Sequence, residues 1–309
     1  MTGGVSPGLT SESKRQPDRL PNFFIVGAPK AGTTALYAYL DQHPEVYMSP
    51  LKEPCYFAPE QSQENPYSSW EGYLTLYRGV RAETAIGEAT ACYLWSRTAA
   101  QNIAARVPHG RIIISLRNPV ERAFSQYLEM LTIGATRKSF RQEIDASLSC
   151  SREGKIGYLW PFLEVGRYHE QILRYFKAFP RAQIHILLYD ELVRAPAAAV
   201  AHLYDFLGVN PGFLPDLSRR HNEPAVPKFV GISYLLKQSG AWRYLRNLVP
   251  RPPGPWLRSV MFRSRGSLRM EPSDRAFLTD YYREDIRALA ALLDRDLTSW
   301  LAPAKPQAQ

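Results

Sequence analysis

Cysteine is scarce in this chain of 309 residues, which contains only Cys55, Cys92 and Cys150. Three cysteines so far apart in the sequence are too few and too scattered for a disulfide framework or a zinc cluster. No window approaches eighteen uninterrupted apolar residues, and residues 1–20 are polar and lack the apolar core of a signal peptide. We therefore expect a disordered lead over residues 1–20 and a reducing, cytoplasmic setting.

Acidic residues are missing from residues 225–270, where nine lysines and arginines occur without one aspartate or glutamate. The chain has 38 basic and 29 acidic residues, and 38 less these nine leaves 29, so this segment holds the whole net charge of +9. Such a segment favours an anionic ligand, a nucleic acid or an anionic membrane surface over a surface that is merely solvated. Aromatic residues alternate with the basic ones: Phe229, Tyr234, Trp242, Tyr244, Trp256 and Phe262.

The hydrophobic share of 45% is enough for a large core, and we expect one domain over residues 21–302 followed by a disordered tail at 303–309. Three segments have the composition of buried parallel strands: FFIVG at 23–27, RIIISLR at 111–117 and QIHILLYDEL at 183–192. A helical pattern follows each of them. This alternation predicts an α/β fold, with a central parallel sheet flanked by helices on both faces and ligands bound beyond the carboxyl ends of the strands.

Start and stop signals mark several of the helices. Pro119 stands where a first-turn proline is favourable, and Gly208 is a typical stop. We expect Ser273 to cap the last helix and Trp300 to pack after it.

The segment FFIVGAPKAGTTALYAYLDQHP, residues 23–44, leads from the first strand through a Gly/Pro turn into a helix. A nucleotide-triphosphate loop of the form G-x-x-x-x-G-K-[ST] that starts at Gly27 would need a lysine at position 33. The sequence has Thr33 there, and the lysine, Lys30, lies three residues upstream. The loop therefore holds an anion differently from the end of ATP.

Backbone N–H groups at the start of this helix form an anion cradle. Lys30, inside the loop, can reach a bridging oxygen and stabilise charge on a leaving phosphate. A helix cap with an incidental lysine is the other interpretation of the loop taken alone. The N–H groups come from Ala31, Gly32, Thr33, Thr34 and Ala35.

A second anion-binding element follows the strand at 111–117. The segment SLRNPVERAFSQY supplies Arg117 at the strand end and Ser125 eight residues later in a helix. Arginine suits bidentate recognition of phosphate, and the serine hydroxyl is expected to turn back toward the same group. The other interpretation is a surface arginine and a helix serine with no common function. It would have to hold at this element and at the first loop independently.

These two elements resemble those of a known family. PKAGTTAL is similar to the 5′-phosphosulfate loop, and RNPVERAFSQY to the 3′-phosphate-binding segment, of sulfotransferases that use 3′-phosphoadenosine 5′-phosphosulfate (PAPS). The likeness runs from about Asn22 to Trp300 and is greatest to the heparan-sulfate type and its bacterial relatives. It implies a P-loop-like sulfotransferase fold, PAPS as cofactor, adenosine 3′,5′-bisphosphate (PAP) as product, and no metal.

The resemblance also implies a catalytic base. An acidic residue shortly after the first helix has that role in the heparan-sulfate type, and SPLKEPCYF places Glu53 at the matching position. A carboxylate there would take the proton of an acceptor alcohol, which is otherwise a poor nucleophile. Glu88 in AIGEATACYL is the rival base or an acceptor-orienting group, and a surface glutamate beside Lys52 is the non-catalytic interpretation of Glu53.

The chain departs from the family pattern at two positions. Ala89 stands where heparan-type members often have a second lysine, and Ala91 stands where the cytosolic small-molecule type has a histidine base. A histidine base is therefore not expected, and Lys30 lacks its usual helper. His43, His169 and His221 have no carboxylate or cysteine partner at motif spacing.

Later segments match the family loosely. FRSRGSLRMEPS occupies the place of the basic loop that closes the cofactor site, so Arg265 and Gly266 are candidates for the 3′-phosphate side. HNEP, at residues 221–224, is expected near the nucleotide or the acceptor.

The resemblance predicts a sulfotransferase acting by in-line displacement on a hydroxyl, or secondarily an amine, of a carbohydrate, glycolipid or natural product. A nucleotide kinase or ATPase is the alternative enzyme, but Thr33 rather than a lysine directly precedes Thr34, and Arg117 stands where a magnesium-binding aspartate is needed. A non-enzymatic membrane- or nucleic-acid-binding module is the alternative based on residues 225–270. With the enzyme as premise we expect no nucleic-acid partner and only peripheral contact with anionic membrane.

Overall fold

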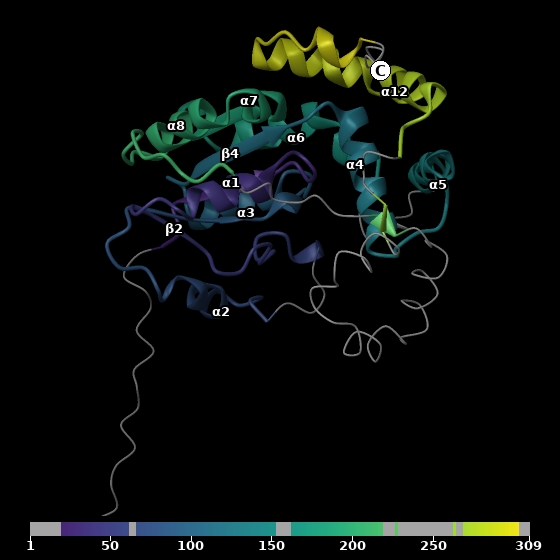
Figure 1. The fold of residues 1–309 in the computed structure, drawn as a ribbon. Coiled ribbons are helices and arrows are strands. Elements are labelled where there is room, and N and C mark those ends of the chain that lie inside the picture. Colours follow the sequence, from purple (N-terminus) through teal and green to yellow (C-terminus); the bar gives the residue numbers. More distant parts are fainter. Residues whose placement is uncertain are drawn as a thin grey trace, which may run out of the picture.

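Figure 1 shows the fold in a computed structural model, which describes residues 20–61, 66–152, 162–218, 226–227, 262–263 and 268–302. Five parallel strands form the central sheet in the order β2-β3-β1-β4-β5, which confirms the predicted α/β fold. The strands are β1 Phe23–Gly27, β2 Val46–Met48, β3 Ala85–Ala89, β4 Arg111–Leu116 and β5 Ile184–Leu188. A separate antiparallel pair joins β6 Val226–Pro227 to β7 Phe262–Arg263.

Helices occupy most of the rest of the described chain. The α-helices are α1 Thr33–Leu40, α2 Trp70–Leu74, α3 Ala99–Arg106, α4 Pro119–Thr132, α5 Phe140–Arg152, α6 Tyr168–Ala178, α7 Tyr189–Arg194, α8 Pro196–Leu207 and α12 Pro272–Leu293. Short 3₁₀ turns are η1 Pro59–Gln61, η2 Thr75–Tyr77, η3 Ala91–Tyr93, η4 Glu164–Gly166, η5 Arg181–Gln183 and η7 Thr298–Trp300. None of the helices in these described ranges is long and apolar enough to cross a membrane.

The two faces of the sheet build two hydrophobic clusters, because alternate residues of a strand point to opposite sides. Phe23 and Ile25 of β1 pack into the cluster that contains side chains of α1, α7 and α8. Phe24 and Val26 pack into the larger cluster, which contains side chains of α3, α6 and α12. Every residue of β1 is buried, as its uninterrupted apolar run predicts.

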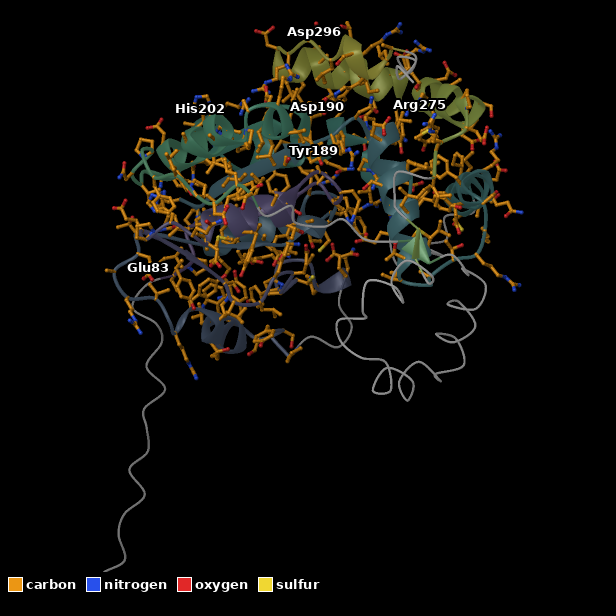
Figure 2. All side chains as sticks on the ribbon, viewed as in Figure 1. Glu83, Tyr189, Asp190, His202, Arg275 and Asp296 are labelled. Atoms are coloured by element: carbon orange, nitrogen blue, oxygen red, sulfur yellow. The ribbon has the colours of Figure 1, made fainter. Side chains whose placement is uncertain are left out.

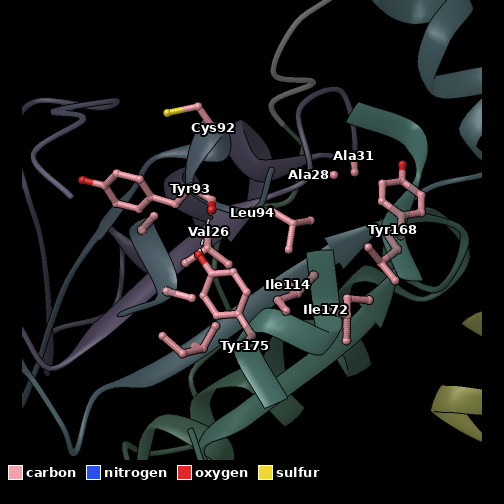
Figure 3. Close-up of a cluster of buried hydrophobic side chains, with 14 of the residues drawn as sticks. Val26, Ala28, Ala31, Cys92, Tyr93, Leu94, Ile114, Tyr168, Ile172 and Tyr175 are labelled. Atoms are coloured by element: carbon pink, nitrogen blue, oxygen red, sulfur yellow. Dashed lines mark hydrogen bonds between the residues drawn. The ribbon is translucent and has the colours of Figure 1, made fainter. Parts of the chain in front are cut away.

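Aromatic residues tie the larger cluster together (Figure 3). Tyr168, Ile172 and Tyr175 recur at helical spacing and lie on the buried face of α6. The hydroxyl of Tyr175 donates to the carbonyl oxygen of Tyr93, at 2.9 Å, and so connects α6 to the turn that follows β3. Trp300 is buried in the same cluster, as expected.

The strand order places a switch point at β1. The chain reaches β2 and β3 on one side of β1, and then β4 and β5 on the other. Loops that follow β1, β3 and β4 therefore meet at one edge of the sheet, where open α/β sheets bind ligands.

Two predicted boundaries were wrong. The strand predicted at 183–192 is β5, which ends at Leu188 rather than at residue 192. The Glu191 carboxylate accepts the N–H of Leu188, and α7 begins at the next residue. The last helix begins at Pro272 with Glu271 at the N-cap, so Ser273 lies inside the first turn. Proline is favoured at that first position because its φ is already helical.

A glycine in β3 is required by close packing. A Cβ on Gly87 would lie 2.5 Å from the ring of Phe23, its neighbour across the β1–β3 pair. We expect Gly87→Ala to lower the free energy of unfolding by about 1–3 kcal/mol, as overpacking of a core does. Urea denaturation measures the loss, and Phe23→Leu in the same chain should restore part of it.

Gly212→Ala is the matched control for that substitution, because Gly212 is exposed and a Cβ there would meet only the Asn210 side chain, at 3.2 Å. Equal losses at Gly87 and Gly212 would contradict a steric role for Gly87.

Candidate active site

The loop between β1 and α1 is fixed by a side chain of β4. The hydroxyl of Ser115 donates to the carbonyl oxygen of Ala31 at 2.6 Å, and the N–H of Ala28 donates to the carbonyl oxygen of Ser115 at 2.7 Å. Gly32 has φ of 87° and stands at the N-cap of α1. A Cβ on Gly32 would lie 3.0 Å from the ring of Tyr189, so both conformation and space favour glycine there.

The start of α1 offers backbone N–H groups to an anion. The first amides of any helix have no intrahelical acceptor, and no side-chain hydrogen bond caps this end. Thr33 and Thr34 are the first two residues of the helix. The partial positive charge of the helix N-terminus adds to the attraction for an anion.

Lys30 lies in the same loop in a left-handed conformation, with φ of 67°. Such a conformation is uncommon for a non-glycine residue and concentrates at functional sites. The Lys30 Nζ forms an ion pair with Glu129 Oε1 at 2.8 Å, and the Lys30 side chain is only 17% exposed. Lys30 is thus a sheltered cation at the carboxyl end of β1.

Arg117 directly follows β4 and is held in place by three contacts. Its Nη1 donates to the carbonyl oxygen of Lys30 at 3.2 Å. Its guanidinium carbon lies 4.8 Å from the ring centroid of Tyr189, the first residue of α7, which is labelled in Figure 2. The hydroxyl of Tyr168 donates to the carbonyl oxygen of Arg117 at 3.0 Å. These contacts join Arg117 to the Lys30 loop, to α7 and to α6.

The helix α4 presents Ser125 and Glu129 four residues apart, which places them on one side of the helix. The Asn118 side chain accepts the N–H of Val120, and Pro119 is the first helical residue, as predicted. Ser125 is buried. Because Glu129 contacts Lys30, this side of α4 faces the loop after β1.

Glu53 lies in the loop after β2 and is bound to the end of β3. Its N–H donates to the carbonyl oxygen of Ala89 at 2.9 Å, and its Oε2 accepts the N–H of Ala91 at 2.8 Å. Its Oε1 accepts from Lys52 Nζ at 2.6 Å. The Glu53 side chain is 32% exposed and φ is 62°, so a left-handed residue again stands at this edge.

Glu88, the rival base, is completely buried in β3. Tyr73 and Tyr93 donate hydroxyl hydrogen bonds to its Oε1, at 2.7 and 3.1 Å, and Thr90 donates to its Oε2 at 2.5 Å. Burial raises the pKa of Glu88 to about 7, against the lowering effect of the three hydroxyl groups. This geometry favours a structural role for Glu88, as the acceptor of three buried hydrogen bonds, over the role of a base that contacts an acceptor substrate.

The raised pKa of Glu88 predicts a pH dependence of stability. A folded pKa of about 7 lies above the ordinary 4.5, so the contribution of Glu88 is fully present below pH 4.5 and is lost as the pH rises through 7. The difference corresponds to roughly 3 kcal/mol. We expect Glu88→Gln to remove this component, so that urea denaturation at pH 5 and pH 8 shows a smaller decline than in the wild type. An equal decline in both proteins would contradict the assignment.

The structure thus brings Lys30, Arg117 and Glu53 to the carboxyl ends of adjacent strands, as the parallel sheet predicts. It adds Glu129 and Tyr189, which the sequence analysis missed. Glu129 follows Ser125 by four residues, a helical spacing that could have identified it. Tyr189 was missed because the strand predicted at 183–192 included it, whereas it is the first residue of α7. Arg265, Gly266 and residues 221–224 lie outside the described residues.

Residues 20–220 match the family model of the sulfotransferase domain. The crystal structure of a sulfotransferase from Alicyclobacillus acidocaldarius is similar, with 31% identity, a TM-score of 0.71, and coverage of 92% of this chain and 100% of that one.

Two human proteins are also similar to the chain. Heparan sulfate glucosamine 3-O-sulfotransferase 6 of Homo sapiens is 31% identical over 208 residues, which cover 66% of this chain and 57% of that protein. Bifunctional heparan sulfate N-deacetylase/N-sulfotransferase 2 of Homo sapiens is 29% identical over 298 residues, which cover 92% of this chain and 31% of that protein. The chain therefore spans only part of the length of each of these relatives.

Proposed function

The chain belongs to the sulfotransferase family, and on that premise we propose that it transfers the sulfonyl group of PAPS to a hydroxyl group of a carbohydrate-type acceptor. The observation that carries the proposal is the meeting of a sheltered lysine, a fixed arginine and an accessible carboxylate at one edge of the sheet. Two human relatives are named for action on heparan sulfate, which supports an acceptor of the carbohydrate class.

The residues present fit PAPS as cofactor. Gly32 leaves the start of α1 without a side chain, so the amides of Gly32, Thr33 and Thr34 would hold the 5′-phosphosulfate. The N–H groups of Ala31 and Ala35, also predicted to bind it, already donate to the carbonyl oxygens of Ala28 and Gly32. Arg117 and Ser125 would hold the 3′-phosphate. We propose that Arg265 and Gly266 also bind on the 3′-phosphate side of the cofactor. PAPS, when bound, supplies a sulfonyl group whose leaving group is a phosphate.

Glu53 is the proposed catalytic base. One of its oxygens is fixed by a backbone N–H and the other by Lys52, and a third of the side chain remains open to an approaching acceptor. Its carboxylate takes the proton from the acceptor hydroxyl, which makes the oxygen a competent nucleophile for in-line attack. A hydroxyl is the acceptor we propose first and an amine the second, and either must lose a proton to such a base. The burial of Glu88 favours Glu53 over it.

Lys30 has the proposed role of stabilising charge on the leaving phosphate. The Lys30 side chain is largely sheltered from solvent and its ammonium group is paired with the more exposed Glu129 carboxylate, which an incoming anion would replace. Arg117 holds the carbonyl of Lys30 and thereby fixes the loop conformation. A kinase would instead need a magnesium-binding acid after β4, where the chain has Arg117 and Asn118.

The first test is calorimetric titration with PAP, in parallel with ATP, each without and with magnesium. We expect PAP to bind much more tightly than ATP. Transfer of labelled sulfonyl groups from PAPS to heparan-type oligosaccharides, glycolipids and small alcohols then identifies the acceptor. Binding of magnesium-ATP together with failure of PAP would overturn the proposal in favour of a kinase.

The basic segment at 225–270 is proposed to dock an anionic acceptor or an anionic membrane surface. Its charge supports this, because nine cations without one carboxylate attract such surfaces through forces that salt screens. We expect vesicles with anionic lipids to bind the protein at low salt and to release it at high salt, with transfer to a soluble acceptor retained. Binding that is insensitive to salt and to removal of the arginines would contradict this role.

A further inference from the structure

Cys55 and Cys92, which are 37 positions apart in the sequence, meet in the fold. The sulfur atoms of Cys55 and Cys92 lie 3.8 Å apart, and both residues are free thiols. A carboxylate oxygen of Glu53 joins them, and the three ligand atoms all lie within 4.8 Å of one another.

The fold builds this cluster from two neighbouring strand ends. Glu53 and Cys55 belong to the loop after β2, and both have left-handed backbone conformations, with φ of 62° and 55°. Cys92 belongs to the turn η3, directly after β3, and its sulfur points away from the Tyr175 side of the core in Figure 3. The Cys55 thiol also donates to the carbonyl oxygen of Glu53 at 3.3 Å.

We propose that Cys55, Cys92 and Glu53 form a binding site for a thiophilic divalent cation, with Zn²⁺ as the best fit, and that the bound cation inhibits the enzyme. Two sulfur ligands at about 2.3 Å from a tetrahedral zinc ion lie roughly 3.8 Å from each other, which is the separation found here. Three protein ligands leave the fourth tetrahedral position open to water.

The ligand set selects the class of cation. Two thiols and one carboxylate suit zinc and other soft or borderline metals, whereas magnesium and calcium require oxygen ligands. On binding, each thiol gives up its proton to solvent and forms a metal–sulfur bond. The negative charges of the two thiolates and the carboxylate then neutralise the positive charge of the cation. Cys92 is buried, and the cation enters from the exposed side of Glu53.

Inhibition rests on the proposed function, whereas binding does not. A Glu53 carboxylate that coordinates zinc cannot also accept the proton of an acceptor hydroxyl. The enzyme would then keep its affinity for PAP, because Lys30 and Arg117 take no part in the metal site. Zinc would therefore lower kcat and leave PAP binding intact.

Cobalt(II) titration of the phosphine-reduced protein tests the binding directly. We expect one Co²⁺ per chain, with a thiolate-to-metal charge-transfer band and the visible bands of a tetrahedral ion, and displacement of both by Zn²⁺. Cys55→Ser and Cys92→Ser should each weaken binding more than about tenfold. Cys150→Ser is the matched control and should retain the full spectrum, and PAP titration of every variant reports whether it is folded.

Three outcomes would overturn the site: no thiolate band, a band that persists in the Cys55→Ser/Cys92→Ser double variant, or the loss of two free thiols to a disulfide without any cobalt spectrum. In an activity assay, zinc should inhibit the wild type reversibly, with relief by a chelator, and should inhibit Cys55→Ser far less. Zinc that binds through these ligands without inhibition would overturn the regulatory role alone. Absence of transfer in metal-free protein would instead count against the proposed function.

Discussion

Replacement of Glu53 by glutamine is expected to lower kcat for sulfonyl transfer by about 10²–10⁴-fold and to leave the affinity for PAP unchanged. Glutamine has the size of glutamate and keeps an oxygen for the N–H of Ala91, so the loop conformation should survive. It cannot take a proton from the acceptor. The loss should therefore appear in kcat, because it removes an interaction made only in the transition state.

Initial rates with labelled PAPS, together with PAP titration of the same preparation, separate the two effects. Glu71→Gln is a suitable control because Glu71 is exposed in the first turn of α2. Near-normal transfer by Glu53→Gln would remove Glu53 from the mechanism. A parallel loss of PAP affinity would show that Glu53 acts through the structure of the edge rather than as a base.

The central sheet could be predicted because its strands are buried on both faces. A strand such as β1 has no polar alternation, so its apolar run stands out from the surrounding helices. The short strand β2 has three residues and no such run, so only the folded structure identifies it. The strand predicted at 183–192 was too long because composition alone does not locate a strand end. Tyr189 and Leu192 suit a strand locally, but the hydrogen bond from the Leu188 N–H to Glu191 starts a helix there.

The anion-binding half of the site could also be anticipated. Lys30, Thr33, Thr34 and Arg117 lie in short motifs directly after strands, and parallel strands bring such motifs to one edge. These residues could be placed at that edge without knowing any contact between distant parts of the chain. The proposed roles of these residues stay predictions until PAP binding is measured.

The remaining features depend on contacts between distant parts of the chain. Thr90 and Tyr93, two of the three hydroxyl donors to Glu88, lie within AIGEATACYL itself. The third donor, Tyr73, comes from α2, and nothing local predicts its approach. The approach of Cys55 to Cys92 likewise requires β2 and β3 to be neighbours in the sheet. Sequence spacing alone cannot supply either fact, since it does not give the strand order.

Replacement of Arg117 by alanine is expected to weaken PAP binding by about 10²–10³-fold. Hydrogen bonds to a charged group are each worth about 1.5–3 kcal/mol, and a guanidinium can make two to one phosphate. The substitution also removes the contact with the carbonyl oxygen of Lys30, so the loop after β1 loses a restraint. Calorimetric titration of PAP measures the loss, and Arg283→Ala, at an exposed ion pair on α12, should bind as the wild type does.

Arg117→Lys separates charge from geometry at the same position. Lysine keeps the cation but cannot bind a phosphate with two parallel N–H groups or stack on Tyr189 as a planar group, so we expect an affinity between those of alanine and arginine. If lysine restored full affinity, the site would need only positive charge. If alanine bound PAP as tightly as arginine does, the 3′-phosphate would lie elsewhere, and the fixed position of Arg117 between Lys30 and Tyr189 would serve the loop rather than the nucleotide.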